Sequence, residues 1–105
     1  MFTSDPDASG VPWCPDCARS LPAVRRTMTD AGASLLEVNV GQRAAWKSPE
    51  HPFRKDSKIK LTGVPTVLGW SAAGPTARLG GELEAAASPA EAVAVVSRWL
   101  AAQKK

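Results

Sequence analysis

The sequence predicts a small α/β protein, because two segments have the spacing of amphipathic helices and two others have the pattern of strands. We predict helices over residues 14–31 and from Ser88 onward, and strands over residues 34–40 and 63–68. A chain of 105 residues can form one modest hydrophobic core, so residues 1–105 are expected to form a single domain.

The composition excludes several classes of protein. Hydrophobic residues make up 44% of the chain and charged residues 22%, which argues against a wholly disordered chain. No apolar stretch is long enough to span a membrane, and the first residues lack the basic and apolar regions of a secretory signal. The net charge of +3 comes from scattered basic residues without a nucleic-acid-binding motif. We therefore expect a cytoplasmic protein without nucleic-acid or membrane partners.

The first predicted helix has a clear apolar face. Its members recur at intervals of four, three and four residues: Cys17, Leu21, Val24 and Met28. Pro15 suits the first turn, where its missing N–H costs no hydrogen bond, and Asp16 complements the positive end of the helix dipole. We expect Pro22 to kink this helix and Gly32 to end it.

The strands are predicted from alternation and from turn residues. Residues 34–40 alternate in polarity, and three apolar side chains should face one way: Leu36, Val38 and Val40. The strand over residues 63–68 contains Pro65 near its start, and a turn at residues 71–75 leads to a hairpin partner at residues 76–79.

Residues 41–58 form a long polar connection, and connections of this length often carry a short helix. We expect Trp46 and Phe53 to pack onto the core and His51 to be a solvated loop residue.

The last predicted helix has the best-defined start. Ser88, Pro89 and Glu91 fit the N-cap, first and third positions of a capping box. An apolar stripe follows at helical spacing: Ala92, Val93, Val96, Trp99 and Leu100. This stripe is expected to face the core.

The strongest chemical signal is the segment Trp13-Cys14-Pro15-Asp16-Cys17. Two cysteines separated by two residues at a helix start can close a small disulfide and open it again. Cys14, at the exposed first position, meets free N–H groups and the positive dipole end, which favour a nucleophilic thiolate. Cys17, one turn into the helix, is expected to be the more buried thiol that resolves a mixed disulfide.

The two residues between the cysteines favour a reductase over an oxidant. Pro15 removes an N–H that could stabilise the Cys14 thiolate, and Asp16 adds a nearby negative charge. We therefore expect a redox potential below that of dedicated disulfide-forming enzymes.

Two other uses of the cysteine pair compete with redox chemistry. A zinc site needs further ligands, and His51 is the sole histidine while there is no third cysteine, so we expect no metal. A purely structural disulfide is disfavoured without a secretory signal. The segment Val64-Pro65-Thr66 strengthens the redox interpretation, because a cis proline there would present the Val64 backbone beside the dithiol to an extended substrate.

These segments resemble the thioredoxin superfamily and, within it, the branch with a Trp-Cys-Pro-Asp-Cys motif, the thioredoxin domain-containing protein 17 family. Residues 2–28 resemble its active-site loop and kinked helix, residues 38–55 its distinctive insertion, and residues 64–66 its cis-proline loop. The resemblance implies a thioredoxin-like fold with a mixed sheet flanked by helices. The family has a β-α-β part before the position of Phe2, so we expect an N-terminally truncated, marginally stable fold in which residues 1–3 stand in for a central strand.

The resemblance also implies a monomeric, cytoplasmic disulfide reductase. Cys14 would be the nucleophile and Cys17 the resolving thiol, with their redox-active disulfide in place of a separate cofactor. Thioredoxin reductase would supply electrons, and the substrates would be disulfide-containing proteins or small disulfides such as cystine. The substrate-binding residues would be Trp13, Pro15, Asp16, Val64, Pro65 and Thr66.

Two alternatives to a reductase remain open from the sequence. The chain could be a non-catalytic interaction module that binds partners through its groove. It could also be a thiol peroxidase, in which Cys14 is oxidised to a sulfenic acid that condenses with Cys17.

Overall fold

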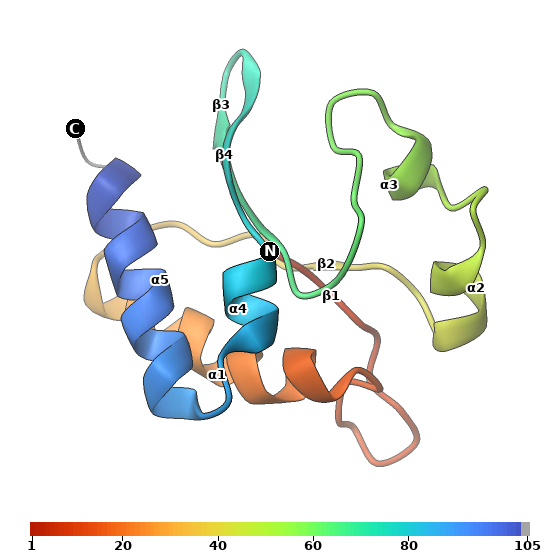
Figure 1. Cartoon of the computed structure of the whole chain (residues 1–105), viewed down its shortest axis with the longest axis horizontal. Helices are drawn as coiled ribbons and strands as arrows, with labels where there is room; N and C mark the ends of the chain where they lie inside the picture. The colour runs from red at the N-terminus through yellow and green to blue at the C-terminus, as the bar shows by residue number, and fades with distance from the viewer. Residues whose placement is uncertain (104–105) are drawn as a thin grey trace.

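The computed structural model describes residues 1–103, in which short strands and helices are interspersed along the chain (Figure 1). In chain order they are β1 (Phe2–Thr3), α1 (Pro15–Asp30), β2 (Val38–Asn39), α2 (Arg43–Lys47), α3 (Pro52–Lys55), β3 (Val67–Ser71), β4 (Gly74–Leu79), α4 (Gly81–Ala85) and α5 (Pro89–Gln103). The predicted α/β class is therefore confirmed. Among these residues no helix combines the length and apolar character needed to cross a membrane.

The strand β1 lies between the two halves of the sheet. It pairs in parallel with β2, with Phe2 opposite Val38. Its other edge meets Thr66, where the Phe2 N–H donates to the Thr66 carbonyl at 2.8 Å and the Thr66 N–H donates to the Phe2 carbonyl at 3.2 Å. Beyond Thr66, β3 and β4 form an antiparallel hairpin with Val67 opposite Leu79. Residues 1–3 thus occupy the central position expected for them.

Helix α1 buries the face that its periodicity predicts. Cys14 is the N-cap with extended backbone angles, and Pro15 occupies the first helical position. The buried side chains include all four predicted members, Cys17, Leu21, Val24 and Met28. The helix continues through Pro22 to Asp30, and Gly32 follows with a φ of 68°, which glycine adopts without a steric penalty.

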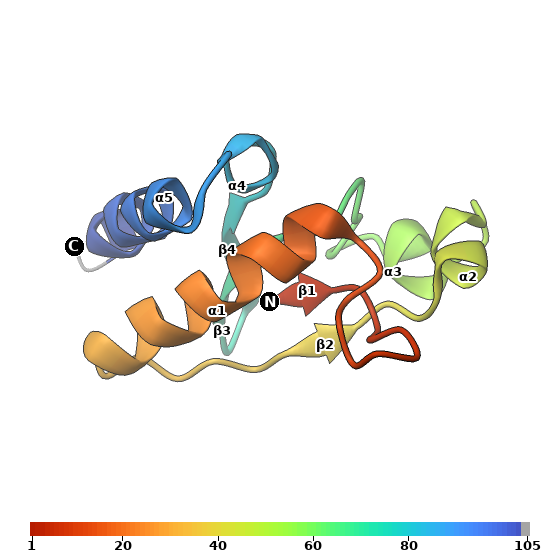
Figure 2. The ribbon, with the colours of Figure 1, turned by 90° about the horizontal axis from the view of Figure 1, so that it is seen from below.

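The C-terminal helix contributes to the same core as α1. Helix α5 packs against α1, and Figure 2 shows the two helices on the same side of the strands. Ala92 and Val96 of the predicted stripe are fully buried, and the remaining members pack against the core while partly exposed. The predicted N-cap bond forms, since the Ser88 hydroxyl accepts the Glu91 N–H at 3.2 Å. The Glu91 carboxylate accepts the N–H of Ala87 at 2.9 Å, one residue before the predicted partner Ser88.

The capping box gives a testable stability prediction. Replacing Ser88 by alanine removes the acceptor for the Glu91 N–H at the start of α5. We expect the free energy of unfolding to fall by about 1 kcal/mol in chemical denaturation. Ser97→Ala is the matched control, because Ser97 is exposed within the same helix, and its effect should stay within about 0.5 kcal/mol. Equal losses in the two variants would contradict the assigned cap.

The predicted strands differ from the observed ones in length. The strand predicted over residues 34–40 is β2, only two residues long, and Leu36 is 77% exposed rather than facing the core with Val40. The reason is that β1 is equally short, and its last contact in this direction is the Met1 ammonium donating to the Leu36 carbonyl at 2.6 Å. The second strand begins at Val67 rather than at residue 63, because the residues before it form a loop around a cis peptide bond.

An open apolar groove of about 730 Å³ runs beside the unpaired segment before β2. Its walls come from residues 33–36, β3 and the end of α5, and the exposed side chains of Leu36 and Trp70 line it.

Helix α4, whose Leu83 is fully buried, was not predicted from the sequence.

The long connection carries two short helices, α2 and α3, at the end of the molecule opposite α5 (Figure 1). Trp46 is buried and Phe53 packs on the same core cluster, as predicted, with the Phe53 ring 5.1 Å from that of Phe2. The prediction for His51 is wrong, because this side chain is buried. Its Nε2 donates to the Val40 carbonyl at 2.6 Å and its Nδ1 accepts the Phe53 N–H at 3.1 Å, which ties α3 to the end of β2.

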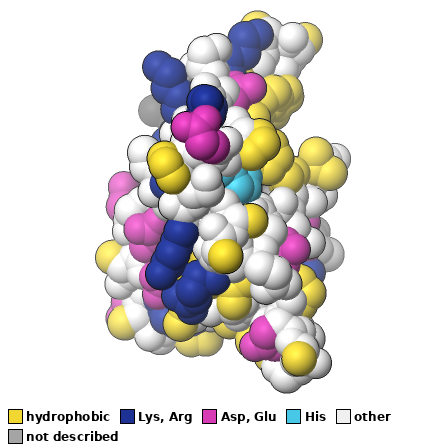
Figure 3. Space-filling model, turned by 90° about the vertical axis from the view of Figure 1, so that its right-hand side faces the viewer, with side chains coloured by type: hydrophobic (Ala, Val, Ile, Leu, Met, Phe, Trp, Pro, Cys, Tyr) yellow, Lys and Arg dark blue, Asp and Glu magenta, His cyan; other side chains and the backbone are white. Residues whose placement is uncertain are grey.

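Basic side chains on this end of the molecule do not form a continuous patch. Figure 3 views the molecule from the side of α2 and α3, and lysine and arginine side chains are interspersed there with acidic and hydrophobic ones. Arg54 lies over the Trp46 ring at 3.8 Å from its centre, and Lys55 pairs with Glu50 at 2.6 Å. These basic groups therefore serve local contacts.

Candidate dithiol active site

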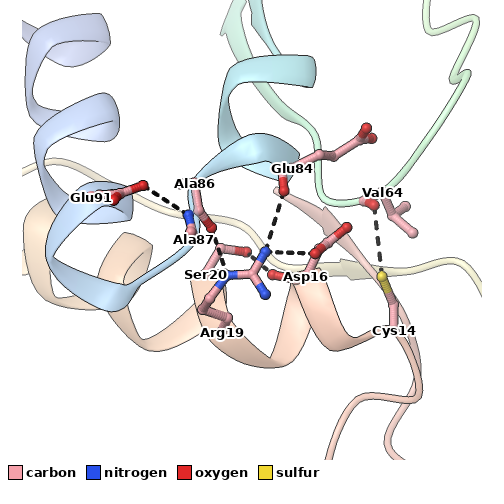
Figure 4. Close-up of polar contacts among 9 residues, drawn as sticks. All are labelled: Cys14, Asp16, Arg19, Ser20, Val64, Glu84, Ala86, Ala87 and Glu91. Carbon is pink, nitrogen blue, oxygen red and sulfur yellow. Dashed lines mark hydrogen bonds and ion pairs between the residues drawn. The ribbon is translucent and has the colours of Figure 1, made fainter.

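Both cysteines lie where the start of α1 meets the loop before β3. They are free thiols, and the Cys14 thiol donates to the Val64 carbonyl at 3.8 Å (Figure 4). The Val64–Pro65 peptide bond is cis, as the redox interpretation anticipated. The two motifs separated by fifty residues in sequence therefore come into direct contact.

The burial of the two thiols differs from the prediction for one of them. Cys14 is only 9% exposed, although we expected an exposed thiol at the helix start. The loop that carries Val64 covers it, and both residues belong to a core cluster with Phe2 and Trp46.

Cys17 is fully buried, as predicted, and its surroundings change its acidity. Burial raises the pKa of the Cys17 thiol to about 11, because a thiolate loses its hydration in the interior. The Ser4 backbone and the Thr3 hydroxyl act to lower the pKa of this thiol, whereas a charge on Cys14 adds to the rise. Cys17 is therefore a thiol, not a thiolate, in the resting dithiol form.

Trp13 is fixed beside the dithiol by the segment that follows β2. Its indole Nε1 donates to the Gly41 carbonyl at 2.8 Å, and the Arg43 guanidinium lies 4.8 Å from the ring centre. Gly41 has a φ of 95°, a backbone conformation that disfavours other residues. The ring is half-buried and forms one wall of the site.

Asp16 is held by a network that the sequence interpretation did not include. The Arg19 guanidinium pairs with the Asp16 carboxylate at 2.5 Å and donates to the carbonyls of Ala86 at 2.6 Å and Glu84 at 3.2 Å (Figure 4). The cation offsets the negative charge of Asp16 near the dithiol. The signal available in the sequence was the three-residue spacing of Asp16 and Arg19 on a helix.

Glu84 is a second carboxylate near the loop before β3. Burial, followed by the charge of Asp16, raises the pKa of the Glu84 carboxyl above its ordinary value. The carboxylate lies close against Gly63, so a side chain at this position would displace the end of the Glu84 side chain. Nothing local in the sequence marks Glu84, because α4 is placed by its contacts with α1.

The predicted binding residues do not all remain available to a ligand. Thr66 is buried, both of its backbone groups are bonded to Phe2, and its hydroxyl donates to the Gly63 carbonyl at 2.7 Å. Val64 is the residue of this loop whose carbonyl faces Cys14. Pro15 is exposed at the helix start, beside the dithiol. Within residues 1–103 no three metal-ligating side chains come together.

A helix that starts with a Cys-x-x-Cys dithiol, facing a cis-proline loop at the edge of a mixed strand arrangement, defines a thioredoxin-like domain. The family model for the thioredoxin domain of thioredoxin domain-containing protein 17-like proteins matches residues 1–88. The chain belongs to this family.

Individual relatives agree with the family assignment. The chain is 41% identical over 73 residues to the thioredoxin-like protein Clot of Arabidopsis thaliana, covering 67% of this chain and 54% of that protein. The Clot protein of Oryza sativa subsp. japonica is 36% identical over 100 residues, with 89% and 72% covered. Thioredoxin domain-containing protein 17 of Homo sapiens is 41% identical over 69 residues, with 64% and 54% covered. The chain thus spans about half the length of most of these relatives.

Proposed function

We propose that the chain is a thiol–disulfide oxidoreductase that works as a reductase of protein and small-molecule disulfides. Family membership supports redox chemistry in general terms. The observation that carries the proposal is the position of Cys14, at the N-cap of α1 with its sulfur 3.8 Å from the Val64 carbonyl. A sulfur there lies at the positive end of the helix dipole and beside a backbone segment that a substrate can pair with.

The reaction needs two exchanges between sulfur atoms. The Cys14 thiolate attacks one sulfur of the substrate disulfide, and the other substrate sulfur leaves as a thiolate that takes up a proton. The Cys17 thiol then loses its proton and attacks the Cys14 sulfur. A Cys14–Cys17 disulfide forms and the second substrate thiol is released, so the substrate gains the two electrons that the dithiol loses.

The walls of the site suggest how a substrate is oriented. Trp13 is held by Gly41 on one side, and Val64 presents its backbone on the other. An extended substrate would lie between them, with Pro15 and the Asp16–Arg19 pair at the helix start beneath it. Thr66 would support the loop rather than touch the substrate, because its polar groups are already bonded.

The proposal includes a source of electrons and a compartment. The dithiol must be regenerated after each turnover, and we propose thioredoxin reductase with NADPH as the donor. Such recharging is favoured in a reducing compartment, so the proposed location is the cytoplasm.

The test follows disulfide reduction by the 105-residue chain in two arms. One arm couples reduction of insulin or cystine to NADPH oxidation through thioredoxin reductase. The other arm supplies dithiothreitol instead, so that a mismatch with the reductase does not mask the chemistry. We expect turnover in both arms.

Absence of turnover in both arms would overturn the proposal. Turnover of hydrogen peroxide alone would point to a thiol peroxidase. No turnover together with partner binding by a Cys14→Ser variant would point to an interaction module. Turnover with dithiothreitol alone would keep the reductase and reject the proposed electron donor.

A further inference from the structure

Arg43 brings a positive charge to one wall of the dithiol site. Its guanidinium lies 4.8 Å from the centre of the Trp13 ring and donates to the Trp13 carbonyl at 3.3 Å. That carbonyl belongs to the peptide unit that joins Trp13 to Cys14, and the N–H of the same unit donates to the Ser4 hydroxyl at 3.1 Å. The cation is therefore bonded to the peptide unit directly before the nucleophilic residue.

The segment that carries Arg43 is fastened to the loop before α1. The Gly41 carbonyl accepts the Trp13 indole N–H at 2.8 Å, and the Gly41 N–H donates to the Asp5 carboxylate at 3.0 Å. Stacking on an aromatic ring and hydrogen bonding restrict the long arginine side chain before any ligand arrives. A ligand that binds this guanidinium therefore has less side-chain entropy to remove.

This guanidinium has no acidic partner within residues 1–103. The ion pairs found there use other cations, namely Arg19, Arg25, Arg26 and Lys55. The Asp5 carboxylate of the adjoining loop binds the Gly41 N–H and makes no ion pair with Arg43. An arginine has five N–H donors in a planar fork, so the bond to the Trp13 carbonyl leaves donors for a carboxylate of a ligand.

The opposite wall of the site carries a carboxylate instead. The Glu84 carboxylate lies against Gly63, the residue before Val64. Figure 4 shows this carboxylate extending toward Val64 and away from the Arg19 guanidinium, which binds the Glu84 carbonyl at 3.2 Å. The Asp16 carboxylate, in contrast, is paired with Arg19. An anionic group of a substrate is therefore repelled from this wall and attracted to the opposite one.

We propose that Arg43, stacked on Trp13, is the anion-binding group of the site and selects peptide disulfides that carry an acidic side chain next to the reacting cysteine. The substrate carboxylate binds the guanidinium while the peptide backbone pairs with Val64, which places the substrate sulfur at Cys14. This inference rests on the proposed reductase function and adds a class of substrate to it. Arg43 is a specificity-determining residue, because it binds the substrate away from the reacting sulfur atoms.

Two peptides that differ only in charge test this selection. Each holds one cysteine joined by a disulfide to a coloured aromatic thiol, with either glutamate or glutamine on both sides of the cysteine. The Cys14 thiolate attacks the peptide sulfur, and the aromatic thiolate that leaves gives the rate. Each rate is divided by the rate of the same peptide with mercaptoethanol, because a flanking charge alters the reactivity of the disulfide itself. We expect the glutamate peptide to be favoured by about fivefold.

Variants assign this preference to one side chain. Arg43→Gln should lower the preference to about one, and Arg43→Glu should reverse it, because the wall then repels a carboxylate. Arg26→Gln is the matched control, because it removes the same charge from an 81% exposed side chain in the last part of α1. This control should keep the preference of about fivefold.

The salt dependence of the wild-type chain covers the case in which a variant at residue 43 disturbs Trp13. The preference should decline as the ionic strength rises, because ions screen an exposed charge pair. The inference is overturned by a wild-type preference that is absent or independent of salt, by a preference that survives in Arg43→Gln, or by an equal loss in Arg26→Gln. Failure of the wild-type chain to release the aromatic thiolate from either peptide would instead reject the proposed function.

Discussion

A Cys14→Ser variant is expected to lose disulfide reduction, with a rate at least about a thousandfold below that of the wild-type chain. The serine hydroxyl is not ionised near neutral pH and cannot form a disulfide, so the first exchange has no nucleophile. The fold should be retained, because serine at the N-cap of α1 is itself a favourable capping residue. The measurement is the rate at which the variant releases the first thiolate from a symmetric aromatic disulfide whose thiolate is coloured, with circular dichroism as a check of the fold.

Cys17→Ser is the matched variant and should behave differently. Cys14 still attacks, but no resolving thiol follows, so the mixed disulfide accumulates. Mass spectrometry should detect one substrate thiol bound per chain, removable by dithiothreitol. If Cys14→Ser accumulates this adduct and Cys17→Ser does not, the roles of the two cysteines are reversed. If neither variant differs from the wild type, the dithiol is not the reacting group.

The dithiol site was predictable because its signals are local in the sequence. A helix start, a proline in the first turn and two cysteines one turn apart place Cys14 and Cys17 in their observed positions whatever the rest of the fold does. The pairing of this helix with the Val64–Pro65 loop is not local. It was predicted only because a proline at a strand start was interpreted together with the cysteines.

The exposure of Cys14 was not predictable in the same way. The expectation treated the helix start as an isolated end, whereas the loop before β3 lies over it. The Arg19 network was not predictable for the same reason, because it depends on residues that are distant in the sequence. Its carbonyl acceptors on Glu84 and Ala86 lie more than sixty residues further along the chain.

His51 and Leu36 show the limits of polarity patterns. His51 stands in a polar segment, yet the Trp46 and Phe53 rings lie 5.1 Å and 5.4 Å from its ring, and both of its nitrogens are bonded. Leu36 stands in a regular alternation, yet no strand pairs with its segment within the described residues. Alternation describes which way side chains point, whereas burial needs a neighbour to pack against.

Leu83→Ala is expected to lower the free energy of unfolding by about 2–5 kcal/mol, because it leaves a cavity in the core. Leu83 is fully buried in α4 and belongs to the same cluster as Leu21 and Val24 of α1. A loss of this size is a large share of the stability of an ordinary small domain, so the variant should unfold at much lower denaturant concentration.

Leu36→Ala is the matched control for this substitution, because the same atoms are removed from a side chain that is 77% exposed. Its effect should stay within about 0.5 kcal/mol in the same chemical denaturation experiment. Comparable losses in the two variants would mean that the groove beside Leu36 is closed in solution. A small loss for Leu83→Ala would mean that α4 does not contribute to the core. The five residues of α4 carry no strong helix signal, so we attribute the position of α4 to the packing of Leu83 and to its contacts with α1. This position also places the Glu84 carbonyl where the Arg19 guanidinium binds it.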